Sequence, residues 1–220
     1  MGKQLFLLLA FLFSALLVYS QFLQDRVTGK YYFDVKYTDV KGSPFLYDDW
    51  RPSLITYANG LQLKNVKLKF NLVSNKPLFL RNDSAFEFLN AVWEFVIYNP
   101  AGDSVIYRNG FEAAGNISPD AYLEIMEDGK LSLLRYRPKT ITYTKGFSTA
   151  VTTAEFTFKP PVLYLFDDKI LIRLKHNDEA VLKDTMKKDW VLVSDYIKLK
   201  KLNLKKDSDV LSAVRYFNSL

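Results

Sequence analysis

Carboxylates beside a tryptophan are the residues of this chain best suited to chemistry. Asp48 and Asp49 directly precede Trp50, and Tyr47 stands before them. A glycosidase needs two carboxyl groups across a cleft, one of them with a raised pKa, and a tryptophan ring can stack on a sugar. Turn-forming aspartates and a core tryptophan are the plainer interpretation. The sequence therefore predicts a ligand-binding site at these four residues, with a carbohydrate-active hydrolase as an alternative.

Other catalytic groups are scarce. Glu94 beside Trp93 is a second carboxylate–tryptophan pair, but adjacent residues on a strand point to opposite faces. Ser148 has only His176 as a possible base, because the chain holds one histidine and no cysteine. Those counts exclude thiol nucleophiles, cysteine zinc sites and any site with two histidines. The aspartate pairs lack the spacing of a calcium loop, so we expect no catalytic residue, no metal and no cofactor.

Aromatic residues are concentrated between residues 31 and 57, in the N-terminal quarter of the mature chain. They offer either a binding groove for glycan, lipid or protein, or a hydrophobic core, and strand alternation favours the core. The residues concerned are Tyr31, Tyr32, Tyr37, Phe45, Tyr47, Trp50 and Tyr57.

The composition is that of an ordinary globular protein with a mild positive charge. Its 220 residues are 49% hydrophobic and 25% charged, with a formal net charge of +6. These proportions exclude a disordered tail, a collagen-like fibre and a multi-span membrane protein. Residues 175–220 hold ten Lys or Arg against seven Asp or Glu, which either solvates helices or favours an anionic surface. Basic residues are not interleaved with an aromatic platform, so we expect no nucleic-acid partner.

The first twenty residues have the pattern of a signal peptide. Residues 2–4 are weakly basic, and residues 5–19 are almost wholly apolar. As a helix the apolar run rises roughly 22 Å, short of the roughly 30 Å hydrocarbon core of a bilayer. We expect cleavage between Ser20 and Gln21, with an uncleaved anchor as the alternative. The protein would then be exported to the periplasm or cell surface, with no transmembrane span after signal removal.

Short alternating segments dominate from residue 31 to about residue 174. Residues 66–72 alternate strictly, which is typical of a strand with one buried face. Asn59-Gly60 accepts the positive φ angles of a type I′ turn and predicts a hairpin. The sequence predicts a mainly β fold of about ten strands, arranged as an antiparallel, hairpin-connected meander, sandwich or open barrel.

The pattern changes to a helical one near His176. Cap residues and helical spacing predict about three short helices, none long enough to be stable alone. The expected organisation is a signal peptide over residues 1–20, an antiparallel β domain over 21–175, and a helical segment over 176–220 packed on the β domain.

Both ends of the mature chain carry recognisable runs. The run GSPFLYDDW at 42–50 is followed by Asn59-Gly60, and the later runs are LYL at 163–165, ILI at 170–172, YIK at 196–198, KKDSDV at 205–210 and YFN at 216–218. In these runs the chain resembles uncharacterised secreted, β-rich envelope proteins of Bacteroidota. The resemblance implies export and a β-rich fold, and it carries no catalytic residue.

Three short sites match the O-glycosylation pattern of that phylum, which is Asp, then Ser or Thr, then an apolar residue or Thr. The candidate acceptors are Ser84, Ser104 and Thr185. The first two fall at predicted turns, where a transferase could reach them. Thr185 falls in a predicted helix, which disfavours it.

These patterns together predict an exported envelope protein that acts by non-enzymatic binding or structural association. Its partner would be an envelope protein, a glycan or a lipid. A hydrolase using carboxylates near Trp50 is one alternative, and peripheral attachment to a membrane surface through the C-terminal lysines is another.

Overall fold

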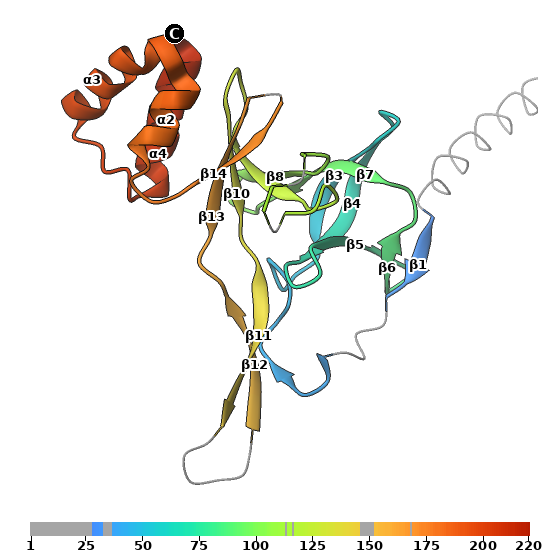
Figure 1. Ribbon diagram of the computed structural model, residues 1–220. Coiled ribbons are helices and arrows are strands. Elements are labelled where there is room, and N and C mark those ends of the chain that lie inside the picture. The colour runs from blue at the N-terminus through green and yellow to red at the C-terminus, as the bar shows by residue number, and fades with distance from the viewer. Residues whose placement is uncertain (1–27, 33–36, 113, 116, 146–151, 168) are drawn as a thin grey trace, which may run out of the picture.

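The computed structural model describes residues 28–32, 37–112, 114–115, 117–145, 152–167 and 169–220. The predicted signal peptide, its cleavage site at Ser20 and Gln21, and Ser148 lie outside these residues. The fold is mainly β, with helices at the C-terminal end of the chain (Figure 1).

The described part of the chain holds fourteen strands, so the expectation of about ten is wrong. The additional strands are short or lie outside the main sheet. Such strands have no extended buried face, so their sequences show little alternation of apolar and polar residues. The strands are β1 (Gly29–Tyr31), β2 (Val40–Lys41), β3 (Arg51–Tyr57), β4 (Gln62–Asn71), β5 (Lys76–Arg81), β6 (Ser84–Phe88), β7 (Val92–Tyr98), β8 (Ser104–Arg108), β9 (Leu123–Glu127), β10 (Ser132–Tyr136), β11 (Lys139–Lys145), β12 (Thr152–Phe158), β13 (Val162–Phe166) and β14 (Leu171–Leu174).

Eleven of these strands form one antiparallel sheet in the order β1-β6-β5-β4-β3-β7-β8-β9-β10-β13-β14. The chain runs outward from β3 through β4, β5 and β6, then returns to the other side of β3 at β7 and continues outward again. This is a meander with one change of direction, and among the described strands its two edges are β1 and β14.

The remaining strands form a small sheet in the order β11-β12-β2. Figure 1 shows β11 and β12 extending away from the main sheet, with β2 alongside β12. β2 runs parallel to β12, with Val40 opposite Ala154, whereas the expectation was of antiparallel pairing throughout. Parallel neighbours arise because β2 reaches β12 from a distant part of the chain rather than through a tight turn.

The first half of the main sheet, from β1 to β8, encloses an aromatic core. The alternating residues of β4 place Leu68 and Phe70 inside, where they are about 1% exposed. Phe95 and Tyr107 stack with ring centroids 5.3 Å apart, and the Tyr122 hydroxyl donates to the Val92 carbonyl at 2.6 Å. Each such ring contributes roughly 1.5–3 kcal/mol by leaving water.

The second half, from β9 to β14, is covered on both faces. In β10, Leu133 faces the helices and Leu134 faces the segment between β8 and β9. β13 alternates in the same way, with Leu163 and Leu165 toward the helices and Tyr164 on the other face. Burial on both faces explains why these strands are nearly continuous apolar runs.

The chain ends in the helices α2 (Glu179–Met186), α3 (Trp190–Lys200) and α4 (Asp207–Ser219). Asp178 caps α2, as its sequence position predicts, by accepting a hydrogen bond from the Val181 amide. α4 buries Val210, Val214 and Phe217 in the cluster that it shares with β10 and β13. The helices therefore form a second layer over one half of the sheet (Figure 1).

Candidate functional site

A large cavity lies along the edge strand β14. Its volume is about 1010 Å³, and all of β14 lines it, together with the start of β13 and the prolines before it. Pro160 and Pro161 end the β11–β12 arm because neither can donate to a strand ladder, and the chain then bends into β13. We refer to this cavity as the β14 groove.

The walls of the β14 groove are apolar and come from both faces of the sheet. Ile117, Tyr164 and Leu171 line it on one face. Leu174 and Leu204 line it on the face that packs against α4. A groove that continues around a sheet edge is suited to an elongated ligand with apolar groups on both sides.

The charges that line the β14 groove are all basic. Lys159, Arg173, Lys175 and His176 are among its lining residues, and no aspartate or glutamate within the described ranges is. All four side chains are exposed, so a bound group could reach them. His176 lies on the solvated junction between β14 and α2, as its sequence position predicts. The groove therefore favours an anionic or partly anionic ligand.

The predicted ligand-binding residues lie elsewhere, on the segment before β3. Asp49 accepts from the Arg51 guanidinium at 3.1 Å, and that guanidinium stacks on the Tyr47 ring at 3.5 Å. The Lys69 ammonium lies over the Trp50 ring, and its nitrogen is 5.2 Å from the ring centroid. Asp48 is exposed on the same segment. The structure thus brings Tyr47, Asp49 and Arg51 together as an ion pair on an aromatic ring, and none of the four predicted residues lines the β14 groove.

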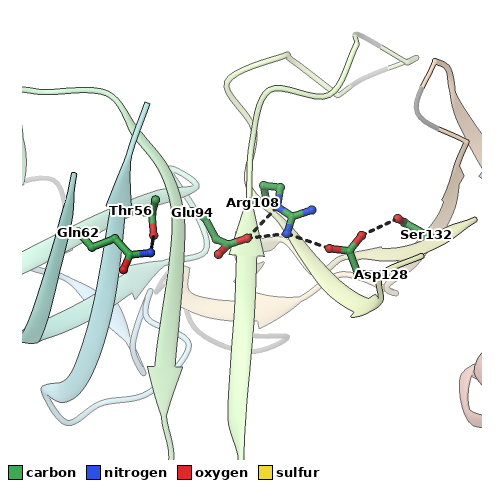
Figure 2. A network of polar contacts seen from close by, with 6 residues as sticks. All are labelled: Thr56, Gln62, Glu94, Arg108, Asp128 and Ser132. Carbon is green, nitrogen blue, oxygen red and sulfur yellow. Dashed lines mark hydrogen bonds and ion pairs between the residues drawn. The ribbon is translucent and has the colours of Figure 1, made fainter. Parts of the chain in front are cut away.

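The second carboxylate–tryptophan pair belongs to an ion-pair network between strands (Figure 2). Arg108 on β8 contacts Glu94 on β7 at 2.7 Å and Asp128 at 3.0 Å, and its guanidinium also lies 5.0 Å from the Trp93 ring centroid. Ser132 donates to the other Asp128 oxygen at 3.0 Å. Burial alone would raise the pKa of Asp128, but the hydrogen bond and charge of Arg108 outweigh burial and hold that pKa below its ordinary value.

Glu124 is the most deeply buried carboxylate described, at 7% exposure, and it is also paired. Arg135 donates two hydrogen bonds to it, at 2.6 and 3.0 Å, and Arg137 lies 2.8 Å away. Burial is the main reason that the pKa of the nearby Tyr107 hydroxyl rises to about 12, and the Glu124 charge adds to the shift. This carboxylate holds two arginines in place.

A second, shallower cavity of about 540 Å³ lies beside β5 and β6. Glu87 and Asp120 line it, and Lys76 contacts Glu87 at 3.7 Å. The carboxylates near Trp50 do not line it either.

The candidate glycosylation sites differ in access. Ser84 begins β6 directly after the turn residues Asn82 and Asp83, and Ser104 is exposed at the start of β8. The Thr185 hydroxyl donates to the Val181 carbonyl inside α2 at 2.8 Å. Ser104 is the most accessible of the three hydroxyls, and Thr185 is already engaged.

Two further properties concern membranes and metals. Within the ranges that the structure describes, no helix has both the length and the apolar character needed to cross a bilayer. The same residues contain no group of three or more potential metal ligands.

Comparison with protein-family models, with curated proteins and with solved structures found no match to this chain.

The β14 groove was not predicted from sequence. Its signals were present, namely the Pro160-Pro161 break and the basic residues at 159, 173, 175 and 176. They converge only because β13 and β14 form a hairpin that brings residues 159 and 175 to the same end, with Leu163 opposite Leu174.

Proposed function

We propose that this protein is an exported, non-enzymatic binding protein of the cell envelope that holds its partner in the β14 groove. The observation that carries the proposal is a large apolar cavity whose charged lining is wholly basic. Binding needs complementary shape and charge, both of which the groove offers. The signal-like N-terminus of the sequence supports export to the periplasm or cell surface.

The pairing of the buried carboxylates favours binding over hydrolysis. Glycoside hydrolysis uses one carboxyl group with a raised pKa across a cleft from another. Glu94 and Glu124 are both held by arginine, and Asp49 is paired with Arg51. Releasing such carboxylates for proton transfer would first require breaking these ion pairs.

The test is capture of a partner that depends on the groove. The purified protein is immobilised and exposed to the envelope fraction of its source, and retained proteins, glycans and lipids are identified by mass spectrometry. The groove variant is Arg173→Glu/Lys175→Glu. The matched control is Lys64→Glu/Lys67→Glu, which makes the same charge change at exposed positions of β4 outside both cavities.

We expect the wild type and the control to retain a common partner that the groove variant loses. Identical capture by all three proteins would refute the β14 groove as the binding site.

A second candidate function is peripheral attachment to an anionic membrane surface through α3. Val191, Leu192 and Leu199 on this helix are 64%, 51% and 77% exposed, unusually high for large apolar side chains. Lys198 and Lys200 stand beside Leu199. An apolar stripe with flanking lysines suits the headgroup boundary of an anionic bilayer.

This second function predicts salt-sensitive sedimentation with vesicles that contain phosphatidylserine. Leu192→Ser/Leu199→Ser should abolish the sedimentation, whereas Tyr143→Ser on the arm, also an exposed residue, should not. Absence of wild-type sedimentation at low salt would rule out this function.

A further inference from the structure

The edge strand β14 has one side available for pairing. Among the described strands its hydrogen-bonded neighbour is β13, with Leu163 opposite Leu174 and Phe166 opposite Leu171. In an antiparallel pair the backbone groups of alternate residues point away from the partner strand. About half of the N–H and C=O groups of β14 therefore point toward its free side, where an extended chain could bond to them.

This free edge lies in a cavity rather than on a flat surface. Every residue of β14 lines the β14 groove, as do the two residues that follow it, Lys175 and His176. Four residues of strand extend roughly 13 Å. The groove therefore follows the whole edge and has room for an elongated segment of comparable length.

Apolar side chains flank the edge above and below the plane of the sheet. Leu171 joins Ile117 on one face, and Leu174 joins Leu204 and Val210 on the other. The side chains of an added strand would alternate between these two faces. Apolar residues of the ligand would then enter both walls of the groove.

We propose that β14 accepts an extended acidic peptide segment as an additional strand; this rests on the proposed function of the groove. Lys159, Arg173 and Lys175 supply a basic lining without a carboxylate, so acidic residues in the segment are complementary to it. A second copy of this chain is a poorer occupant, because pairing β14 with β14 would place Arg173 and Lys175 of each copy in one basic groove.

The probe is a fluorescently labelled peptide of repeating Val-Val-Glu-Glu, which places both valine and glutamate on each face of an added strand. Its binding to the purified protein is followed by fluorescence anisotropy. One comparison peptide replaces every glutamate with lysine. Another keeps the sequence but carries an N-methyl group on every amide, which removes the hydrogen-bond donors from both edges while keeping the charge. We expect binding of the first peptide alone.

Protein variants locate the binding. Arg173→Glu/Lys175→Glu should weaken binding of the acidic peptide about tenfold, because two favourable charge pairs become repulsive. Lys64→Glu/Lys67→Glu should bind as the wild type does. Far-UV circular dichroism verifies that both variants fold, and Lys159→Glu offers a separate disruption of the groove outside β14.

Amide hydrogen exchange gives the direct readout of strand addition. Bound peptide should slow exchange in residues 171–174 and leave the strands β3 and β4 unchanged. Equal binding of the N-methylated peptide, or binding without protection of β14, would overturn strand addition.

The remaining outcomes separate this inference from the function on which it rests. If the acidic peptide does not bind but groove-dependent capture from the envelope succeeds, the ligand class is wrong and the groove is right. If both fail, both are wrong. Concentration-dependent dimers whose formation slows amide exchange in residues 171–174 would identify a second copy as the occupant and also overturn the peptide proposal.

Discussion

Glu124 lies between the guanidinium groups of Arg135 and Arg137. It accepts two hydrogen bonds from Arg135 on the neighbouring strand and contacts Arg137, which in turn lies 3.4 Å from the Tyr107 hydroxyl. A buried carboxylate with two guanidinium partners is fixed in orientation. At the scale of single residues, the buried charges of this protein serve position rather than proton transfer.

Glu124→Gln should destabilise the protein by about 3 kcal/mol, because it leaves two partly buried guanidinium groups without their charge partner. Urea denaturation measures the change. Glu127→Gln on the same strand is the matched control: it breaks the Arg215 pair, in which the arginine side chain is 60% exposed, and should cost less than about 1 kcal/mol. Similar losses for the two variants would contradict this account.

Tyr107 should make stability fall in alkaline solution. Burial raises its pKa to about 12, whereas a tyrosine in the unfolded chain titrates near 10. Below pH 10 both states keep the proton, and above it the unfolded state loses the proton first. The stabilisation is therefore complete below about pH 10 and is lost as the pH rises through about 12, at up to roughly 1.4 kcal/mol per pH unit.

Tyr107→Phe should flatten this decline in a series of urea denaturations between pH 9 and 12. Tyr143→Phe, on an exposed side chain of β11, is the control and should leave the slope unchanged. An unchanged slope in Tyr107→Phe would show that another group governs alkaline unfolding.

At the scale of elements, the sequence predicts strands best where one face is buried. The alternation of residues 66–72 and the Asn59-Gly60 turn predict the β3–β4 hairpin, and the structure confirms it. The expected type I′ turn is wrong, because Gly60 has a positive φ of 81° but Asn59 does not. Asn65, at a φ of 57°, lies in a β-bulge of this hairpin that the pattern did not reveal. A bulge places two residues opposite one, and nothing local in the sequence requires it there.

β11 was missed although its sequence alternates threonine with Ile141 and Tyr143. That strand lies outside the main sheet, so its alternation does not mark a buried face. The site was harder to predict than the strands. The site predicted around Trp50 rests on residue type alone. The β14 groove, by contrast, depends on which distant side chains the order of the strands brings together. Spacing along the chain carries no such information.

Asn218 should be a principal attachment of α4 to the sheet. Its side chain donates to the Leu131 carbonyl at 3.0 Å and accepts from the Leu131 amide at 3.1 Å, next to the hairpin glycine Gly129. Asn218→Ala should cost about 1–2 kcal/mol in thermal or urea denaturation, because two backbone groups lose their partner. Ser219→Ala, which removes an exposed bond within the helix, is the control and should have little effect.

At the scale of the whole molecule, the two halves of the main sheet meet through a narrow junction. β8 and β9 pair at two positions only, Tyr107 with Glu124 and Arg108 with Leu123. Side chains reinforce this junction, and Arg108 reaches from Glu94 in the first half to Asp128 in the second (Figure 2). The halves have separate apolar clusters, so polar contacts such as these contribute to their cooperation.

Arg108→Ala should therefore uncouple the halves in denaturation. Near-ultraviolet circular dichroism reports on the aromatic core of the first half, and the far-ultraviolet helical signal reports on the second. In the wild type the two transitions should coincide, and in the variant they should separate. Arg81→Ala, on β5 within the first half, is the control and should keep them together. Coincident transitions in Arg108→Ala would show that the β8–β9 pairs suffice alone.

The parallel pairing of β2 with β12 affects the order in which the strands can pair during synthesis. Val40 pairs with Ala154, so β2 cannot form its hydrogen bonds until the much later strand β12 is present. The β3–β4, β4–β5 and β5–β6 hairpins involve near neighbours and can close while synthesis continues. β2, by contrast, cannot pair until β12 has been made, and a chain cut short before residue 152 would leave Val40 and Lys41 with no strand to join.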